Sequence, residues 1–174
     1  AAEDIEIPGA RTLLGATRDS GFVFDNEKWA HEVEVKPFRI ARFPVTNAQY
    51  LEFVQSGGKA PRYWKKEDDQ WLERRFDRWR LPVPESPVLH VDWHEAQAYC
   101  AWARRRLPTE AERELAGEKI EPGGVWEWTA STFGPYPGCV VDPYKEYSEP
   151  WFGNHRVLRG GSFAAPARLL RNTF

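Results

Sequence analysis

Proline and tryptophan together place the strongest constraint on how this chain can fold. The 174 residues include 14 prolines and nine tryptophans. Proline interrupts helices and central strands, because its ring fixes φ and leaves no backbone N–H to donate. Tryptophan buries a large apolar area, but its indole N–H still needs a partner. We therefore expect a loop-rich fold with short strands, few long helices and a core built largely from indole rings.

The length, charge and hydropathy of the chain exclude several classes of protein. A chain of 174 residues is one domain by size and can bury a sizeable core. The formal net charge of -2 provides no basic field that would attract nucleic acid. A mean hydropathy of -0.65, without a long apolar run, excludes a membrane span. We expect neither a nucleic-acid partner nor a membrane partner.

The cysteine content indicates a reducing compartment. Two cysteines, Cys100 and Cys139, are too few for the disulfide framework of a small secreted domain. The first residues also lack the charged and apolar regions of a signal peptide. We therefore expect a cytoplasmic protein.

Alternating apolar residues predict strands near the N-terminus. Ile5 and Ile7 precede a turn at residues 8–9, and residues 12–15 are expected to form an edge strand after it. Residues 31–40 alternate in the way expected of a half-buried strand.

Three N-terminal capping residues predict three helices. The caps are Thr46, Asp92 and Thr109, and the last two have a glutamate three residues later, as a capping box requires. The first helix is expected over residues 47–55, because the glycines at 57–58 would end it. The second is expected to run to the arginines at 104–106, whose charges suit the C-terminal end of a helix dipole. The third is expected to be short.

Residues 59–84 are rich in arginine and aromatic side chains and allow two interpretations. Arginines interleaved with aromatic residues occur on surfaces that bind nucleic acid. The acidic residues among them, and the nearly neutral chain, favour a solvated hairpin that packs on tryptophan.

Five sequence motifs occur in an order that is specific in combination. They are Pro44–Asn47 with the helix that follows, Pro87–Trp102, Arg106–Glu112, Val125–Thr129 and Arg159–Phe163. Together they resemble the formylglycine-generating-enzyme fold family. The resemblance implies an α+β, irregular, C-type-lectin-like fold with short antiparallel strands and two to three helices. It also implies that residues 1–174 form a single domain.

Phe22–Glu27 and residues 136–152 narrow the resemblance. They are similar to the GFxFDNE and YPGF…DPYKEYSxPWF segments of the C-terminal domain of ergothioneine-biosynthesis sulfoxide synthases. That family is implied to join an N-trimethylated histidine (hercynine) to a thiol such as γ-glutamylcysteine or cysteine, using nonheme iron(II) and O2. Selenoneine synthases share the pattern, so both activities are open.

The histidines of this chain do not form an obvious iron site. In the sulfoxide synthases the three iron ligands come from a separate N-terminal helical-bundle domain, so the resemblance implies that domain as a partner and no iron ligand here. His90 and His94 are four residues apart, but His90 precedes the Asp92 cap, so the pair does not share a helical face. His31 and His155 belong to other elements. We interpret the histidine pair as hydrogen-bonded structural residues.

The resemblance implies one catalytic residue in this chain, Tyr136. A tyrosine near the YPGF element faces the iron in that family, and its phenol can donate a proton during sulfoxidation. Tyr136 matches this position. An aromatic residue that only packs the loop is an equally good interpretation. The family's substrate-contacting residues and its closing strand would begin beyond Phe174, so no substrate-binding residue is assigned.

Formylglycine chemistry is excluded by two positions. Enzymes of that type bind copper through two cysteines after the RGGS motif, and those positions are Ala165 and Leu170 here. Neither side chain supplies a thiolate. Cys100 is interpreted as a small buried hydrophobe, and Cys139 replaces an aromatic residue of the YPGF element.

A calcium site is also implied by the resemblance. Gly123, Val125 and Glu127 match three of the four positions around the Trp-Glu-Trp motif, whereas Ile120 stands at the fourth. Calcium prefers six or more oxygen ligands, so the loss of one weakens the site. Glu127 as a buried acceptor for the neighbouring loop is the alternative.

Two irregularities separate this chain from the family pattern. The segment 115–124 is short where the family has several tens of residues, and Arg113 replaces a tryptophan. We expect a shortened loop near 115–124, or a loop from which residues are omitted. A non-catalytic ligand-binding module on the same scaffold is the alternative to an enzyme. The small residues 164–167 offer little recognition chemistry for that role.

Overall fold

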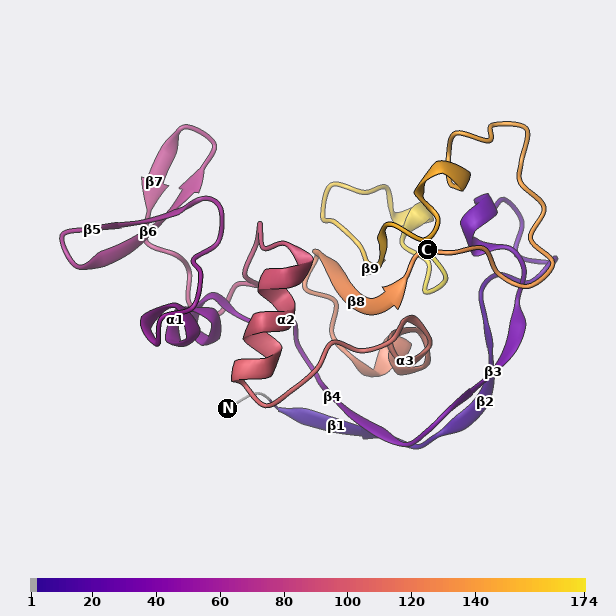
Figure 1. Cartoon of the computed structure of the whole chain (residues 1–174), viewed down its shortest axis with the longest axis horizontal. Coiled ribbons are helices and arrows are strands. Elements are labelled where there is room, and N and C mark those ends of the chain that lie inside the picture. Colours follow the sequence, from indigo (N-terminus) through magenta and orange to yellow (C-terminus); the bar gives the residue numbers. More distant parts are fainter. Residues whose placement is uncertain (1–2) are drawn as a thin grey trace. The chain divides into compact units, whose positions relative to one another are not determined.

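The computed structural model describes residues 3–174 and is an α+β structure of short elements joined by loops (Figure 1). Within these residues there are three α-helices and nine strands, and the paired strands are antiparallel. This confirms the predicted loop-rich α+β fold. The chain forms two compact units, a terminal unit (residues up to Arg42 together with Pro108–Phe174) and a middle unit (Phe43–Leu107). The assignment of residues 1–174 to one domain stays a prediction.

A two-stranded ribbon runs through the N-terminal part of the terminal unit. In it β1 (Asp4–Ile7) pairs with β4 (Phe38–Ala41), and β2 (Ala10–Leu14) pairs with β3 (His31–Val35). The single strand expected over residues 31–40 is therefore wrong, because Pro37 has no N–H for the ladder and separates β3 from β4. Opposite it, a Cβ on Gly9 would lie 2.6 Å from the Val35 carbonyl oxygen, so the interruption needs glycine.

The C-terminal part of the terminal unit packs one helix on a strand pair. Here α3 (Glu110–Ala116) contacts β8 (Trp126–Thr132) and β9 (Arg156–Gly160), which pair with each other. The buried residues Ile7, Ala116 and Ile120 join α3 to the ribbon. Short 3-10 turns complete the unit: η1 (Asp25–Glu27), η2 (Gly117–Lys119), η3 (Glu149–Trp151) and η4 (Ala167–Leu169).

The middle unit packs two helices and a small sheet around aromatic rings. Its elements are α1 (Asn47–Gln55), α2 (Trp93–Trp102) and the sheet β5 (Trp64–Glu67), β6 (Gln70–Arg75) and β7 (Arg78–Arg80). Tyr50 and Tyr99 stack with ring centroids 5.4 Å apart, and Phe53 packs edge-on to both. Cys100 packs against this cluster, as expected of a small hydrophobe.

Tryptophan plays a different part from the one predicted. The buried core residues among positions 3–174 are aliphatic, tyrosine and phenylalanine side chains, and none is tryptophan. Trp71 is only partly buried against the middle core, whereas Trp126 and Trp151 are 38% and 46% exposed. An indole is large and its N–H needs a partner, so it is rarely enclosed completely. The expected indole core is therefore wrong.

The segment after α1 is the predicted solvated hairpin, extended by a third strand. Trp64 and Trp71 lie with ring centroids 6.3 Å apart, and Trp64 also contacts Tyr50 of the core. Phe76 at the β6–β7 turn is 93% exposed.

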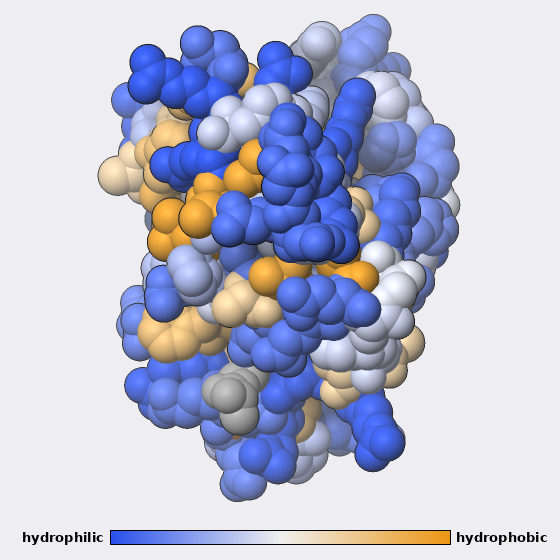
Figure 2. Space-filling view, turned by 90° about the vertical axis from the view of Figure 1, so that its left-hand side faces the viewer, coloured by the Kyte–Doolittle hydropathy of each residue, from blue (hydrophilic) through white to orange (hydrophobic). Residues whose placement is uncertain are grey.

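The face shown in Figure 2 is mostly hydrophilic, with hydrophobic residues in separate areas. No helix within residues 3–174 combines the length and apolar character that crossing a membrane requires.

Candidate functional site

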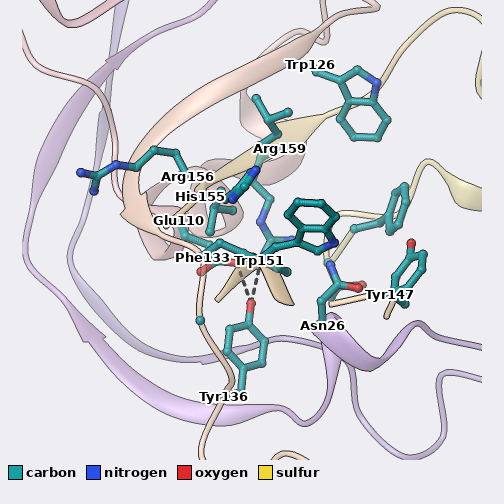
Figure 3. A pocket seen from close by; sticks show the side chains of 15 residues that line it. Asn26, Glu110, Trp126, Phe133, Tyr136, Tyr147, Trp151, His155, Arg156 and Arg159 are labelled. Atoms are coloured by element: carbon teal, nitrogen blue, oxygen red, sulfur yellow. Dashed lines mark hydrogen bonds and ion pairs between the residues drawn. The ribbon is translucent and has the colours of Figure 1, made fainter. Parts of the chain in front are cut away.

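The terminal unit contains a pocket of about 480 Å³ next to the β8–β9 pair (Figure 3). Its lining is largely aromatic: Trp126, Phe133, Tyr136, Tyr147, Trp151 and Phe174. Its charged residues are Glu110, Arg156 and Arg159, of which Glu110 and Arg159 lie close to Tyr136. The pocket therefore combines apolar ring faces with one polar cluster.

The polar cluster is a closed set of hydrogen bonds (Figure 3). The Tyr136 hydroxyl donates to Glu110 Oε1 at 2.7 Å. Arg159 Nη2 donates to the same Glu110 oxygen at 2.7 Å and to the Tyr136 hydroxyl oxygen at 3.0 Å. Arg159 is 3% exposed and Tyr136 is 9% exposed, so these bonds lie largely outside water. Their low-dielectric surroundings make them stronger than surface contacts.

Three separate elements bring this cluster together. Glu110 is the first residue of α3, fixed by the Thr109 cap whose hydroxyl accepts the Glu112 N–H. Arg159 lies in β9, and Tyr136 lies in the loop after β8. The sequence motifs selected Tyr136 alone. Glu110 and Arg159 were missed as site residues, although both lie inside motifs that indicated the fold.

These neighbours decide what the Tyr136 phenol can do. Burial raises the pKa of Tyr136 well above its ordinary value, the Arg159 charge lowers it, and the Glu110 carboxylate raises it again. Tyr136 is therefore a weak acid in this state. Its proton points to Glu110, and Arg159 can stabilise the oxygen if that proton leaves. The hydrogen bonds give Tyr136 polar partners, while its catalytic role and the alternative of a structural aromatic residue both stay predictions.

Three of the aromatic residues that line the pocket belong to one connected group of rings. Trp126 meets Phe174 edge-on with ring centroids 5.7 Å apart. Phe24 contacts Phe174 at 5.2 Å and stacks on Tyr147 at 5.1 Å. Phe24 therefore packs against two of the rings that line the pocket.

Long-range bonds from η1 hold this wall in place. The fully buried Glu27 carboxylate accepts hydrogen bonds from Arg171 and from the Thr173 hydroxyl. Asp25 of the same turn accepts a hydrogen bond from Ser148, next to Tyr147. The sequence marked this segment as a feature of the subfamily, and the structure gives it the function of anchoring two pocket walls.

One of the predicted calcium residues, Glu127, forms an ion pair with an arginine. Arg113 donates through Nε and Nη2 to the two Glu127 carboxylate oxygens at 3.1 Å and 2.9 Å. The Arg113 and Glu127 side chains are only 7% and 21% exposed. Ile120 is buried in the core and offers no oxygen from its side chain. Gly123 and Val125 could offer only backbone carbonyl oxygens, which are fewer ligands than calcium prefers. The Arg113 guanidinium already neutralises the Glu127 carboxylate. The calcium site stays a prediction that this ion pair weighs against.

The four histidines belong to different parts of the fold: His90 and His94 lie in the middle unit, whereas His155 lines the pocket and contacts Trp151 with ring centroids 5.0 Å apart. His90 contacts Tyr63 and His94 contacts Trp93, whereas His31 packs on Tyr136 with ring centroids 4.7 Å apart. Within residues 3–174 there is no group of three or more His, Cys, Asp or Glu side chains that could hold a metal ion. The iron ligands expected from a separate domain stay a prediction.

The cysteines are free thiols. Cys100 and Cys139 lie in different units, and burial is the main cause that raises the pKa of each. A raised pKa keeps a thiol protonated and makes it a poor nucleophile and metal ligand. Neither cysteine replaces the copper ligands that Ala165 and Leu170 cannot supply.

Several known proteins are similar to most of this chain in sequence or in structure. The model of the sulfatase-modifying factor enzyme 1-like domain matches residues 1–119. A hercynine oxygenase of Mycolicibacterium thermoresistibile is 34% identical over 226 positions, covering 90% of this chain and 50% of the relative. The inactive C-alpha-formylglycine-generating enzyme 2 of Mus musculus is 37% identical, covering 71% and 50%. PvdO of Pseudomonas aeruginosa shares the fold at 19% identity and a TM-score of 0.58, covering 99% of this chain and 86% of its own.

These matches cover only part of the relatives. The chain spans about half the length of the curated relatives it matches. The hercynine oxygenase alignment extends over 226 positions although this chain has 174 residues, so the relative carries residues that this chain lacks. The shortened loop near 115–124 stays a prediction. The domain match and the two relatives agree in their assignment: the chain belongs to the sulfatase-modifying factor enzyme 1-like family, which has the formylglycine-generating-enzyme fold.

Proposed function

We propose that this chain is the pocket-bearing part of an oxygenase that joins an N-trimethylated histidine to a thiol with O2, as a step of ergothioneine biosynthesis. Relatives named hercynine oxygenase match 86% to 100% of the chain at 32% to 34% identity. Their name supports a substrate that carries a quaternary ammonium group. The activity of the whole protein, including the iron(II) that would supply the redox chemistry from a separate domain, is part of this proposal.

The observation that carries the proposal is the composition of the pocket. A quaternary ammonium ion cannot donate a hydrogen bond, and proteins bind it on the faces of aromatic rings. Trp126, Tyr147 and Trp151 keep more than a third of their surface exposed while lining the pocket. Glu110 adds a carboxylate close to Tyr136. Arg159 pairs with this carboxylate and Arg156 also lines the pocket, so the exposed ring faces are what favour a trimethylammonium group.

The residues of this chain would bind the substrate and hold a proton beside it. Trp126, Tyr147 and Phe174 would surround the cation, because their rings form one connected wall. Tyr136 would hold the proton needed when an oxygen atom is transferred, with Arg159 left to stabilise the phenolate. The calcium site is not part of this proposal, because Arg113 occupies the carboxylate of Glu127.

Calorimetry with matched ligands tests the binding half of this proposal. The protein should bind N-trimethylated histidine and bind unmethylated histidine much more weakly. Trp126→Ala should weaken binding about tenfold, which is roughly 1.4 kcal/mol and lies in the range of a cation–π contact. Trp79→Ala is the matched control, because Trp79 has similar exposure but lies in the middle unit. Equal affinity for both histidines would contradict the proposal.

A non-catalytic binding module is the second candidate. The Mus musculus relative favours this candidate, because it is 37% identical to this chain and its name describes an inactive enzyme. Oxygen uptake by the full-length protein with iron(II), N-trimethylated histidine and a thiol separates the two candidates. Binding without oxygen uptake supports the module, and replacing the thiol with a selenium donor in the same assay tests the selenoneine alternative.

A further inference from the structure

The hydrogen bonds of Arg159 leave one oxygen of a buried carboxylate without a donor. Nη2 of Arg159 has two protons, and these go to Glu110 Oε1 and to the Tyr136 hydroxyl oxygen. Glu114 Oε2 lies within ion-pair distance of the same nitrogen, at 2.9 Å. It is nevertheless buried without a hydrogen-bond partner among the described residues, because neither N–H bond is directed at it. Three oxygens therefore lie near the two protons of Arg159 Nη2, and Glu114 Oε2 is the one that receives neither.

Glu114 is otherwise enclosed. Its side chain is 9% exposed, and its other oxygen accepts the Gly15 backbone N–H at 3.0 Å. The charged and titratable groups that face it are Arg159 on β9, Glu110 on its own helix and Tyr136 after β8. Burial is the largest cause and raises the pKa of Glu114; Arg159 and the Gly15 N–H lower it, and Glu110 raises it.

The charges of this cluster balance only if one carboxyl group is neutral. Glu110 and Arg159 form a hydrogen-bonded ion pair that carries no net charge. An ionised Glu114 would add a second negative charge, and the groups that face it include no second cation. Burying an uncompensated carboxylate is costly, and such a group normally takes up a proton instead.

We propose that Glu114 is a neutral carboxylic acid in the free protein and that it loses its proton when a cationic ligand enters the pocket. The proton goes to the solvent, and the new carboxylate shares Arg159 with Glu110 while the ligand supplies the second positive charge. Cation binding is therefore coupled to proton release. The second half of this inference rests on the proposed function, because it requires a cation in the pocket.

The neutral acid is tested without any ligand. Infrared spectroscopy of the protein at neutral pH should show the carbonyl band of a protonated carboxyl group. Glu114→Gln should remove this band, and Glu118→Gln should keep it, because Glu118 is exposed at the same end of α3. Absence of the band in the unmodified protein would overturn the inference, and this measurement needs no variant to fold.

The coupling is tested by calorimetry with tetramethylammonium and with N-trimethylated histidine. Titrations in two buffers of different ionisation enthalpy should give different heats, and the difference reports the protons released. Affinity should rise with pH, approaching about tenfold per pH unit while Glu114 is protonated in the free protein. Glu114→Gln should bind both ligands with the same heat in either buffer.

The possible outcomes separate this inference from the proposed function. If neither cation binds, the proposed function fails and the coupling fails with it. If both bind with buffer-independent heats in the unmodified protein, the coupling alone is overturned. If Glu114→Gln still releases a proton, Glu114 is not its source, and the assignment is overturned.

Discussion

Replacing Arg113 by methionine tests whether an internal guanidinium takes the place of a metal ion in this fold. The substitution keeps an unbranched side chain but leaves Glu127 without the two hydrogen bonds at 2.9 Å and 3.1 Å. Breaking a buried ion pair by removing one partner costs roughly 3–5 kcal/mol. Glu127 is 21% exposed, so water can partly solvate the unpaired carboxylate. We therefore expect a loss of stability at the lower end of this range, about 3 kcal/mol.

Thermal unfolding is the assay. A loss of about 3 kcal/mol corresponds to a decrease in Tm of roughly 6–12 °C for a domain of this size. The double variant Arg113→Met with Glu127→Gln should recover part of the loss, because no unpaired charge is left. This non-additivity measures the coupling between the two side chains. Lys119→Met, at an exposed position close by, is the control and should change Tm little.

A response to calcium would contradict this explanation. The unmodified protein should have the same Tm in calcium chloride and in a calcium chelator, because Arg113 already neutralises Glu127. A clear increase in Tm with calcium would show that the ion competes successfully with Arg113. An Arg113→Met variant as stable as the unmodified protein would show that the pair contributes nothing to the fold.

Three other positions give measurable expectations. Tyr136→Phe should lower the turnover of the full-length oxygenase about a hundredfold or more, the usual contribution of general acid catalysis, while calorimetry shows the affinity for N-trimethylated histidine almost unchanged. Gly9→Ala should destabilise the protein by about 1–3 kcal/mol in urea unfolding, because its Cβ would lie 2.6 Å from Val35 O and 2.7 Å from Pro37 Cδ. The pKa of Glu114 is raised by burial, so the folded state holds this proton more tightly than the unfolded state. The stability that this proton contributes is present below the pKa of Glu114 in the unfolded state and is lost as pH rises through its pKa in the folded state. Urea unfolding at several pH values should show this loss in the unmodified protein and not in Glu114→Gln.

Local chemistry made the helices predictable. Thr46, Asp92 and Thr109 each accept the backbone N–H of the residue three positions later, so cap and partner are neighbours in the chain. α1 covers Asn47–Gln55, the range expected from Thr46 and the glycines that follow. The break at Pro37 could also have been read from the chain, because a proline has no N–H for a ladder. The alternating pattern of residues 31–40 concealed it, since apolar side chains continue on both sides of the proline.

The site was predictable only in part. The motifs identified the family and selected Tyr136, because a motif records which residue types occur together. They assigned no role to Glu110 or Arg159, and they placed a calcium ligand at Glu127 where an arginine binds. Nothing in the spacing of Arg113 and Glu127 shows that the two side chains meet, because one lies on a helix and the other on a strand.

The sequence alone thus determined the family, the capped helices, the absence of copper-binding cysteines and the candidate tyrosine. Tertiary structure decided the electrostatics of the pocket. Glu27 bonds to Arg171 across 144 positions, and Glu114 accepts the Gly15 N–H across 99. Whether a buried carboxylate is ionised depends on the donors and charges within hydrogen-bonding distance. In this fold those neighbours come from segments far apart in the chain, so only the folded structure brings them together.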